Sequence, residues 1–176
     1  MTIFDSISAD NLHHAYFVVG GEDTKTEIFD FVENKIGVQT IGNPDFSFFA
    51  LDTLTVDHAR DISEMQSRKS VSRSDLDTDS KVSKVAFDKG RKIFVIQTNI
   101  ITEEAQNALL KIFEEPTPDT HFFILMPQDI LLPTFRSRMQ VVDVSKVAFD
   151  MNSKVSRTVL DTGIAGRLAI VNGLIS

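Results

Sequence analysis

The chain has 176 residues, a formal net charge of −7 and no cysteine. This length suits one domain or two small ones, and the absence of cysteine excludes a disulfide framework and any cysteine-based zinc site. A protein that mainly grips the phosphate backbone of nucleic acid is usually basic, so the net charge argues against that class. No apolar run approaches the ~18 residues of a membrane span, and no apolar leader follows the N-terminus. We therefore expect a soluble, cytoplasmic protein with no membrane partner.

Five short apolar segments alternate with helical patterns along the chain. Continuous apolar runs of this length predict strands that are buried on both faces of a parallel sheet. The predicted strands are Ala15–Val19, Phe46–Leu51, Lys92–Ile96, Phe122–Met126 and Gln140–Val144. The predicted helices begin at Thr24, Thr55, Thr102 and Pro133. This alternation predicts an α/β fold, a doubly wound parallel five-stranded sheet with helices on both faces.

The domain organisation follows from changes in composition. Residues 1–150 are predicted to form the α/β core, interrupted by a Ser-, Asp-, Lys- and Arg-rich surface insertion at 69–86. Residues 151–176 are predicted to start a helical lid or to form a C-terminal tail. The hexapeptide Ser-Lys-Val-Ala-Phe-Asp occurs at 83–88 and again at 145–150. Two copies of so short a unit are too few for a stacked repeat architecture.

The first candidate site is the turn that follows the first predicted strand. A phosphate-binding loop has Gly, four residues, Gly-Lys and then Ser or Thr. Lys25 and Thr26 are in register with that pattern, but Val19 and Thr24 occupy its two glycine positions, and two acidic residues lie between them. Those acids repel an anion. A plain strand-to-helix turn is therefore the favoured interpretation, with Lys25 and Thr26 as a degenerate phosphate loop.

The second candidate is the end of the third predicted strand. Nucleotide hydrolases of this topology place acids there to hold Mg²⁺ and to orient water. Here the residues are Gln97, Thr98 and Asn99, and none is a carboxylate. We expect no metal at this position.

Two further candidates lie around the last predicted helices. Glu114 and Glu115 end a helix, where acids oppose the helix dipole by roughly 0.3–1 kcal/mol each. They form either a solvated helix end or a docking feature. Arg138, with Arg136 and Ser137, ends the short helix that Pro133 opens. Its guanidinium is either solvated or presented to the phosphate of a neighbour during phosphoryl transfer.

The segment from Thr102 to Met139 closely resembles the clamp-loader branch of the AAA+ family. Members carry an Asn-Ala-Leu-Leu-Lys-x-Leu-Glu-Glu-Pro-Pro helix, a Phe-Ile-Leu strand and a Leu-Leu-Pro-Thr-Ile-x-Ser-Arg-Cys segment. The matching residues here are Asn107–Pro116, Phe123–Leu125 and Leu131–Met139. Phe113 replaces a leucine, and Met139 replaces the cysteine.

The resemblance implies a P-loop NTPase-like (AAA+) fold and a role in DNA replication. Clamp loaders are pentameric machines of the DNA polymerase III holoenzyme that open a ring-shaped sliding clamp and place it on primed DNA. The implied partners are other clamp-loader subunits, both ATPase and delta-like, with the sliding clamp and primed DNA reached through the complex.

The resemblance also implies roles for individual residues. Arg138, preceded by Ser137, matches an arginine finger that acts in trans on ATP held by a neighbouring subunit. Some members bind no nucleotide, which agrees with the degenerate loop at Lys25 and Thr26. We therefore expect no cofactor in this chain and no catalysis by the chain alone. Two alternatives stay open, namely a weakly ATP-binding AAA+ ATPase and a stand-alone interaction module derived from a clamp loader.

Overall fold

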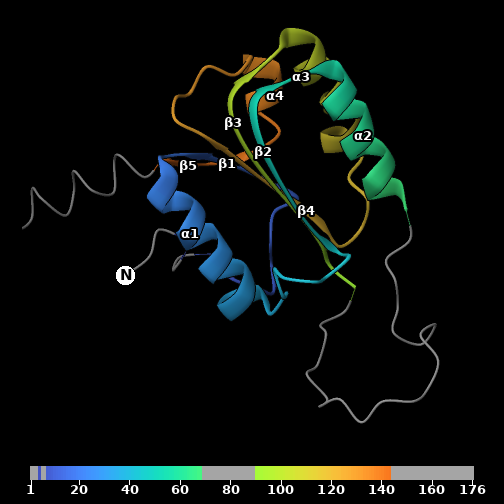
Figure 1. The fold of residues 1–176 in the computed structure, drawn as a ribbon. Helices are drawn as coiled ribbons and strands as arrows, with labels where there is room; N and C mark the ends of the chain where they lie inside the picture. Colours follow the sequence, from blue (N-terminus) through green and yellow to red (C-terminus); the bar gives the residue numbers. More distant parts are fainter. Residues whose placement is uncertain (1–3, 5–6, 69–89, 144–176) are drawn as a thin grey trace, which may run out of the picture. The chain divides into compact units, whose positions relative to one another are not determined.

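A computed structural model describes residue 4, residues 7–68 and residues 90–143 (Figure 1). The predicted insertion at 69–86, the predicted lid or tail at 151–176 and both copies of the hexapeptide lie outside the described residues. In the described part, five strands form one sheet with the order β2-β3-β4-β1-β5.

The strands are β1 (Ala15–Val19), β2 (Phe46–Leu54), β3 (Lys92–Ile101), β4 (Thr120–Met126) and β5 (Gln140–Asp143). The pairs β2–β3, β3–β4 and β4–β1 are parallel. Parallel neighbours require crossover connections, which the intervening helices supply. The predicted fold class is confirmed.

β2 and β3 are longer than the sequence predicts. Their pairing continues to Leu54 and Ile101, whereas the apolar runs end at Leu51 and Ile96. Thr98 is buried within this extension, and its hydroxyl donates to the Ile100 carbonyl at 2.9 Å. The polar side chains therefore end the apolar pattern without ending the strand.

The helices are α1 (Glu22–Phe31), the π-helical turn η1 (Val32–Ile36), α2 (Val56–Ser67), α3 (Glu103–Glu114) and α4 (Pro133–Arg136). α1 begins two residues before the predicted Thr24, because Glu22 and Asp23 suit the positive end of the helix dipole. The predicted cap at Thr102 is confirmed, since its side chain accepts from the backbone N–H of Ala105. Pro133 opens α4 as predicted.

Helices cover both faces of the sheet, with α1 on one face and α2, α3 and α4 on the other (Figure 1). Successive residues of β4 point to opposite faces. Phe122 stacks on Phe94 with ring centroids 5.0 Å apart, on the face that α3 covers. Phe123 stacks on Tyr16 at 5.1 Å on the opposite face. Burial on both faces explains why the apolar runs are continuous.

Candidate functional site

The turn between β1 and α1 consists of two glycines. β1 ends at Val19 and α1 begins at Glu22. The Gly20 N–H donates to the Met126 carbonyl at 2.9 Å, and a Cβ on Gly20 would lie 2.3 Å from the buried hydroxyl oxygen of Thr24. Only glycine fits this close approach. Of the four residues between the glycine positions of the phosphate-loop pattern, the last two already belong to α1, which leaves only Gly20 and Gly21 outside the helix.

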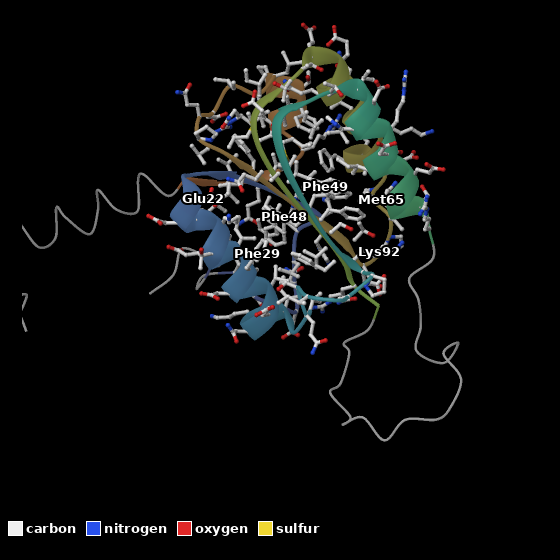
Figure 2. The ribbon with its side chains drawn as sticks, viewed as in Figure 1. Glu22, Phe29, Phe48, Phe49, Met65 and Lys92 are labelled. Carbon is white, nitrogen blue, oxygen red and sulfur yellow. The ribbon has the colours of Figure 1, made fainter. Side chains whose placement is uncertain are left out.

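Glu22 connects two of the predicted site residues. Lys25 Nζ donates to Glu22 Oε1, and Gln97 Nε2 donates to Glu22 Oε2 at 2.7 Å. Figure 2 shows Glu22 at the start of α1, and Lys25 Nζ lies 5.9 Å from the centroid of the Phe48 ring. The hydrogen bonds from Lys25 and then Gln97 hold the pKa of Glu22 below its ordinary 4.5. The Glu22 carboxylate thus accepts a hydrogen bond from Lys25, the residue that matches the lysine of the phosphate-loop pattern.

Glu22→Gln should lower the stability of the chain at neutral pH. A carboxyl whose pKa is depressed on folding stabilises the fold above its unfolded pKa, and this contribution is lost as the pH falls through the folded pKa. The difference in the free energy of unfolding between wild type and variant should therefore shrink below pH 4.5. Because Glu22 is exposed, the effect should be small. Urea unfolding at a series of pH values measures it.

Asp23→Asn is the matched control for this variant. It removes a carboxylate from the same helical turn but leaves the Lys25 and Gln97 contacts of Glu22 in place. The free energy of unfolding of Asp23→Asn should differ from that of wild type by less than that of Glu22→Gln does. A Glu22→Gln difference that does not change with pH would contradict the prediction.

The end of β3 holds amides rather than acids. Asn99 Nδ2 donates to Asp52 Oδ1 of β2 at 2.8 Å. Asp52 was not predicted from the sequence, because this carboxylate comes from the neighbouring strand. Among the described residues, no three or more His, Cys, Asp or Glu side chains gather to hold a metal.

Arg138 forms an ion pair with Glu114. Its Nη2 donates to Glu114 Oε1 at 2.7 Å, and the two side chains are 46% and 47% exposed. The helix end and the arginine, which the sequence suggests as separate candidates, therefore form one feature. Exposed ion pairs contribute about 0–1 kcal/mol, so this pair orients the guanidinium more than it stabilises the fold. The neighbouring Arg136 pairs instead with Asp129, and the Ser137 hydroxyl donates to the Thr134 carbonyl.

Arg138 and Lys25 belong to opposite ends of β1. The carbonyls of Arg138 and Phe113 lie close to the His14 ring, just before β1, whereas Gly20 follows it. Burial lowers the pKa of His14 and the nearby His13 lowers it further, while those two carbonyls oppose the shift. The extended chain from His14 to Gly20 spans about 20 Å. The structure thus brings Lys25 and Gln97 together and keeps Arg138 away from them.

Comparison with known proteins places this chain in a family. The sequence profile described as DNA polymerase III, delta subunit, matches residues 2–148. The chain belongs to this family.

Two similar proteins carry names that refer to subunits of DNA polymerase III. DNA polymerase III subunit delta' of Haemophilus influenzae is 36% identical over 101 residues, a match that covers 54% of this chain and 26% of that protein. The crystal structure of a DNA polymerase III gamma subunit-related protein from Thermotoga maritima superimposes with a TM-score of 0.52 at 20% identity. That match covers 75% of this chain and 41% of the other. This structural likeness shows a shared α/β fold, and the family relationship confirms the clamp-loader resemblance.

One buried polar residue of this DNA polymerase III delta-family chain was not predicted from the sequence. Gln106 is 4% exposed; its Nε2 donates to the Ile101 carbonyl at 3.0 Å, and its Oε1 accepts from the Leu132 N–H at 2.8 Å. It therefore links the end of β3 to the start of α4, the helix that precedes Arg138. The spacing from Gln106 to Leu109 and Phe113, both buried, is the signal that would have placed it on the core-facing side of α3.

The helices of this family member are short. Within residues 7–68 and 90–143, none is long and apolar enough to cross a membrane.

Proposed function

We propose that this chain is a delta-prime-like clamp-loader subunit that does not hydrolyse ATP and that supplies Arg138 to ATP held by a neighbouring ATPase subunit. It works within the DNA polymerase III holoenzyme beside ATPase and delta-like subunits, and it reaches the sliding clamp and primed DNA through the complex. The observation that carries the proposal is the Glu22 carboxylate, which holds both Lys25 and Gln97.

The Glu22 contacts support the absence of a nucleotide in this chain. A bound phosphate would have to displace Glu22 from Lys25 or lie beside its negative charge, and both arrangements cost electrostatic energy. The two-glycine turn adds a second obstacle, because α1 begins within the segment that would have to wrap a phosphate. ATP is therefore assigned to the partner subunit.

The surroundings of Arg138 support action on a neighbour. Its side chain is half exposed, and its place at the far end of β1 from Lys25 separates it from the chain's own loop. Glu114 engages Nη2, and a guanidinium carries five N–H donors in a planar fork that matches phosphate oxygens. Since an exposed ion pair is weak, a phosphate can replace Glu114 at little cost.

A reconstitution tests this proposal. The full chain is mixed with the ATPase subunits of its own organism on a sizing column, and ATP binding to the chain alone is measured by calorimetry. We expect co-elution with the ATPase subunits and no saturable binding below about 1 mM ATP.

Two outcomes would select the alternatives. Micromolar ATP affinity that Lys25→Ala abolishes would establish a weakly ATP-binding ATPase. Failure to co-elute, with no ATP binding, would establish a stand-alone interaction module.

A further inference from the structure

A cavity of about 260 Å³ opens at the amino-terminal ends of β2 and β3, beside the last turn of α2. Figure 2 labels Met65 and Lys92 there, far along the sheet from Glu22. Its wall contains three charged residues, Asp45, Arg68 and Lys92. The cavity involves neither the loop at Lys25 nor Arg138, so any ligand bound in it is independent of the proposed function.

Lys92 is a buried cation without a counter-ion in the described part of the chain. Lys92 is 8% exposed. Its Nζ donates to the Gln66 carbonyl at 3.3 Å and to the Met65 carbonyl at 3.5 Å. Carbonyls at the end of a helix favour a positive charge, but both distances exceed the 2.7–3.2 Å usual for such bonds. The third N–H of the ammonium has no acceptor among the described residues. Burying a charge is costly unless it is paired.

Arg68 adds a second cation at the rim of the cavity. It is exposed at the end of α2, and no described carboxylate lies within ion-pairing distance of it or of Lys92. Asp45 contributes one negative charge to the wall, so two positive charges and one negative charge leave a net charge of +1. A singly charged anion would neutralise this net charge, whereas a phosphate dianion would leave the occupied cavity with a net negative charge.

The rest of the wall is mainly apolar. Pro44, Met65 and Phe94 line the cavity beside the charges. Such surfaces bury hydrocarbon favourably, at about 25 cal/mol per Å². The cavity therefore combines a charge that suits one carboxylate with a surface that suits a short aliphatic stem.

We propose that this cavity is a binding site for a carboxylate on a short aliphatic stem, with Lys92 and Arg68 holding the carboxylate and Met65 and Phe94 contacting the stem. Two sources carry this chemistry, a free small aliphatic acid and the side chain of a glutamate on another protein. In either case the carboxylate supplies the missing acceptor for the Lys92 ammonium.

An NMR titration of the ¹⁵N-labelled full chain tests the proposal with butyrate, uncharged butyramide and inorganic phosphate as probes. Butyrate should shift the amide signals of Met65, Arg68 and Lys92 saturably, with a dissociation constant in the millimolar range. Butyramide should produce no saturable shift, and phosphate should bind more weakly than butyrate. Equal binding of butyramide, tighter binding of phosphate or no saturation by butyrate would overturn the assignment.

Three variants locate the binding. Lys92→Met should weaken butyrate about tenfold or more, and Arg68→Gln should weaken it about threefold. Because Arg68 is exposed, its substitution remains informative if Lys92→Met fails to fold. Arg60→Gln, on the same helix but paired with Asp57 at 3.1 Å, is the matched control and should bind like wild type. Unchanged butyrate binding by Arg68→Gln and by a folded Lys92→Met would place the ligand elsewhere.

A blocked glutamate peptide separates the two sources. If its side chain binds in the cavity more tightly than butyrate does, the natural ligand is assigned to a protein side chain. If butyrate binds more tightly than the peptide, the natural ligand is assigned to a free acid. If neither butyrate nor the peptide binds in the cavity, the proposal is overturned.

Discussion

Arg138→Ala should lower the ATPase rate of the assembled clamp-loader complex by about 1,000-fold or more, as loss of an arginine finger does. The guanidinium is proposed to neutralise charge that develops on the phosphate of a neighbour's ATP. Within the described part of the chain it pairs with the half-exposed Glu114, so its removal should leave the fold intact. Steady-state ATP hydrolysis by the reconstituted complex measures the rate, and circular dichroism of the free chain checks the fold.

Arg136→Ala is the control for that substitution. Arg136 lies two positions from Arg138 and is also paired with a carboxylate, that of Asp129 at 2.8 Å. Its loss should change the ATPase rate by only a few fold. If a complex that assembles normally with Arg138→Ala hydrolyses ATP at the wild-type rate, the proposed role of Arg138 is wrong.

Phe122→Ala should destabilise the chain by about 3–5 kcal/mol. Phe122 is fully buried, stacks on Phe94 at 5.0 Å and meets the edge of Phe113 at 5.1 Å. The substitution removes these ring contacts and leaves a cavity between the sheet and α3. β4 cannot move to fill this cavity, because it is hydrogen-bonded to β1 and β3 on its two sides. Urea denaturation followed by circular dichroism measures the loss.

Phe48→Ala provides the comparison within the same sheet. Phe48 lies on β2 at the end of the strand order and is 38% exposed, although its ring meets Phe29 edge-on at 5.2 Å. Its truncation opens a space that water can fill, so the loss of stability should be less than half of that for Phe122→Ala. Equal losses would contradict the placement of the core between the sheet and α3.

The fold was predictable where a single local rule dominates. β1 has the predicted bounds, because a run buried on both faces is apolar throughout. The end of β3 was not predictable, because Gln97 and Thr98 look like the start of a loop, whereas both pair with β2 and Gln97 also pairs with β4. The start of α1 was displaced by two residues for a similar reason, since its first turn is acidic rather than apolar.

The candidate site was predictable as residues but not as contacts. Local patterns identify Lys25 and Gln97, yet the Gln97–Glu22 hydrogen bond joins positions 75 apart in sequence. The pair of Arg138 and Glu114 likewise spans 24 positions. Such pairings depend on strand order and helix packing, which no short motif encodes. The same holds for the contacts of the buried Lys92 ammonium with the Met65 and Gln66 carbonyls, which join positions 27 and 26 apart in sequence.

The two-glycine turn between β1 and α1 bears on how this protein can evolve. Glycine at positions 22 and 24 would remove the carboxylate and the buried hydroxyl, and in this chain α1 begins directly after Gly21. The segment has the residue count of a phosphate loop, so a nucleotide-binding loop would need the first turn of α1 to unwind as well as new side chains. A single substitution near Lys25 and Thr26 should therefore not restore nucleotide binding, because the early helix start and the Glu22 carboxylate would have to change together.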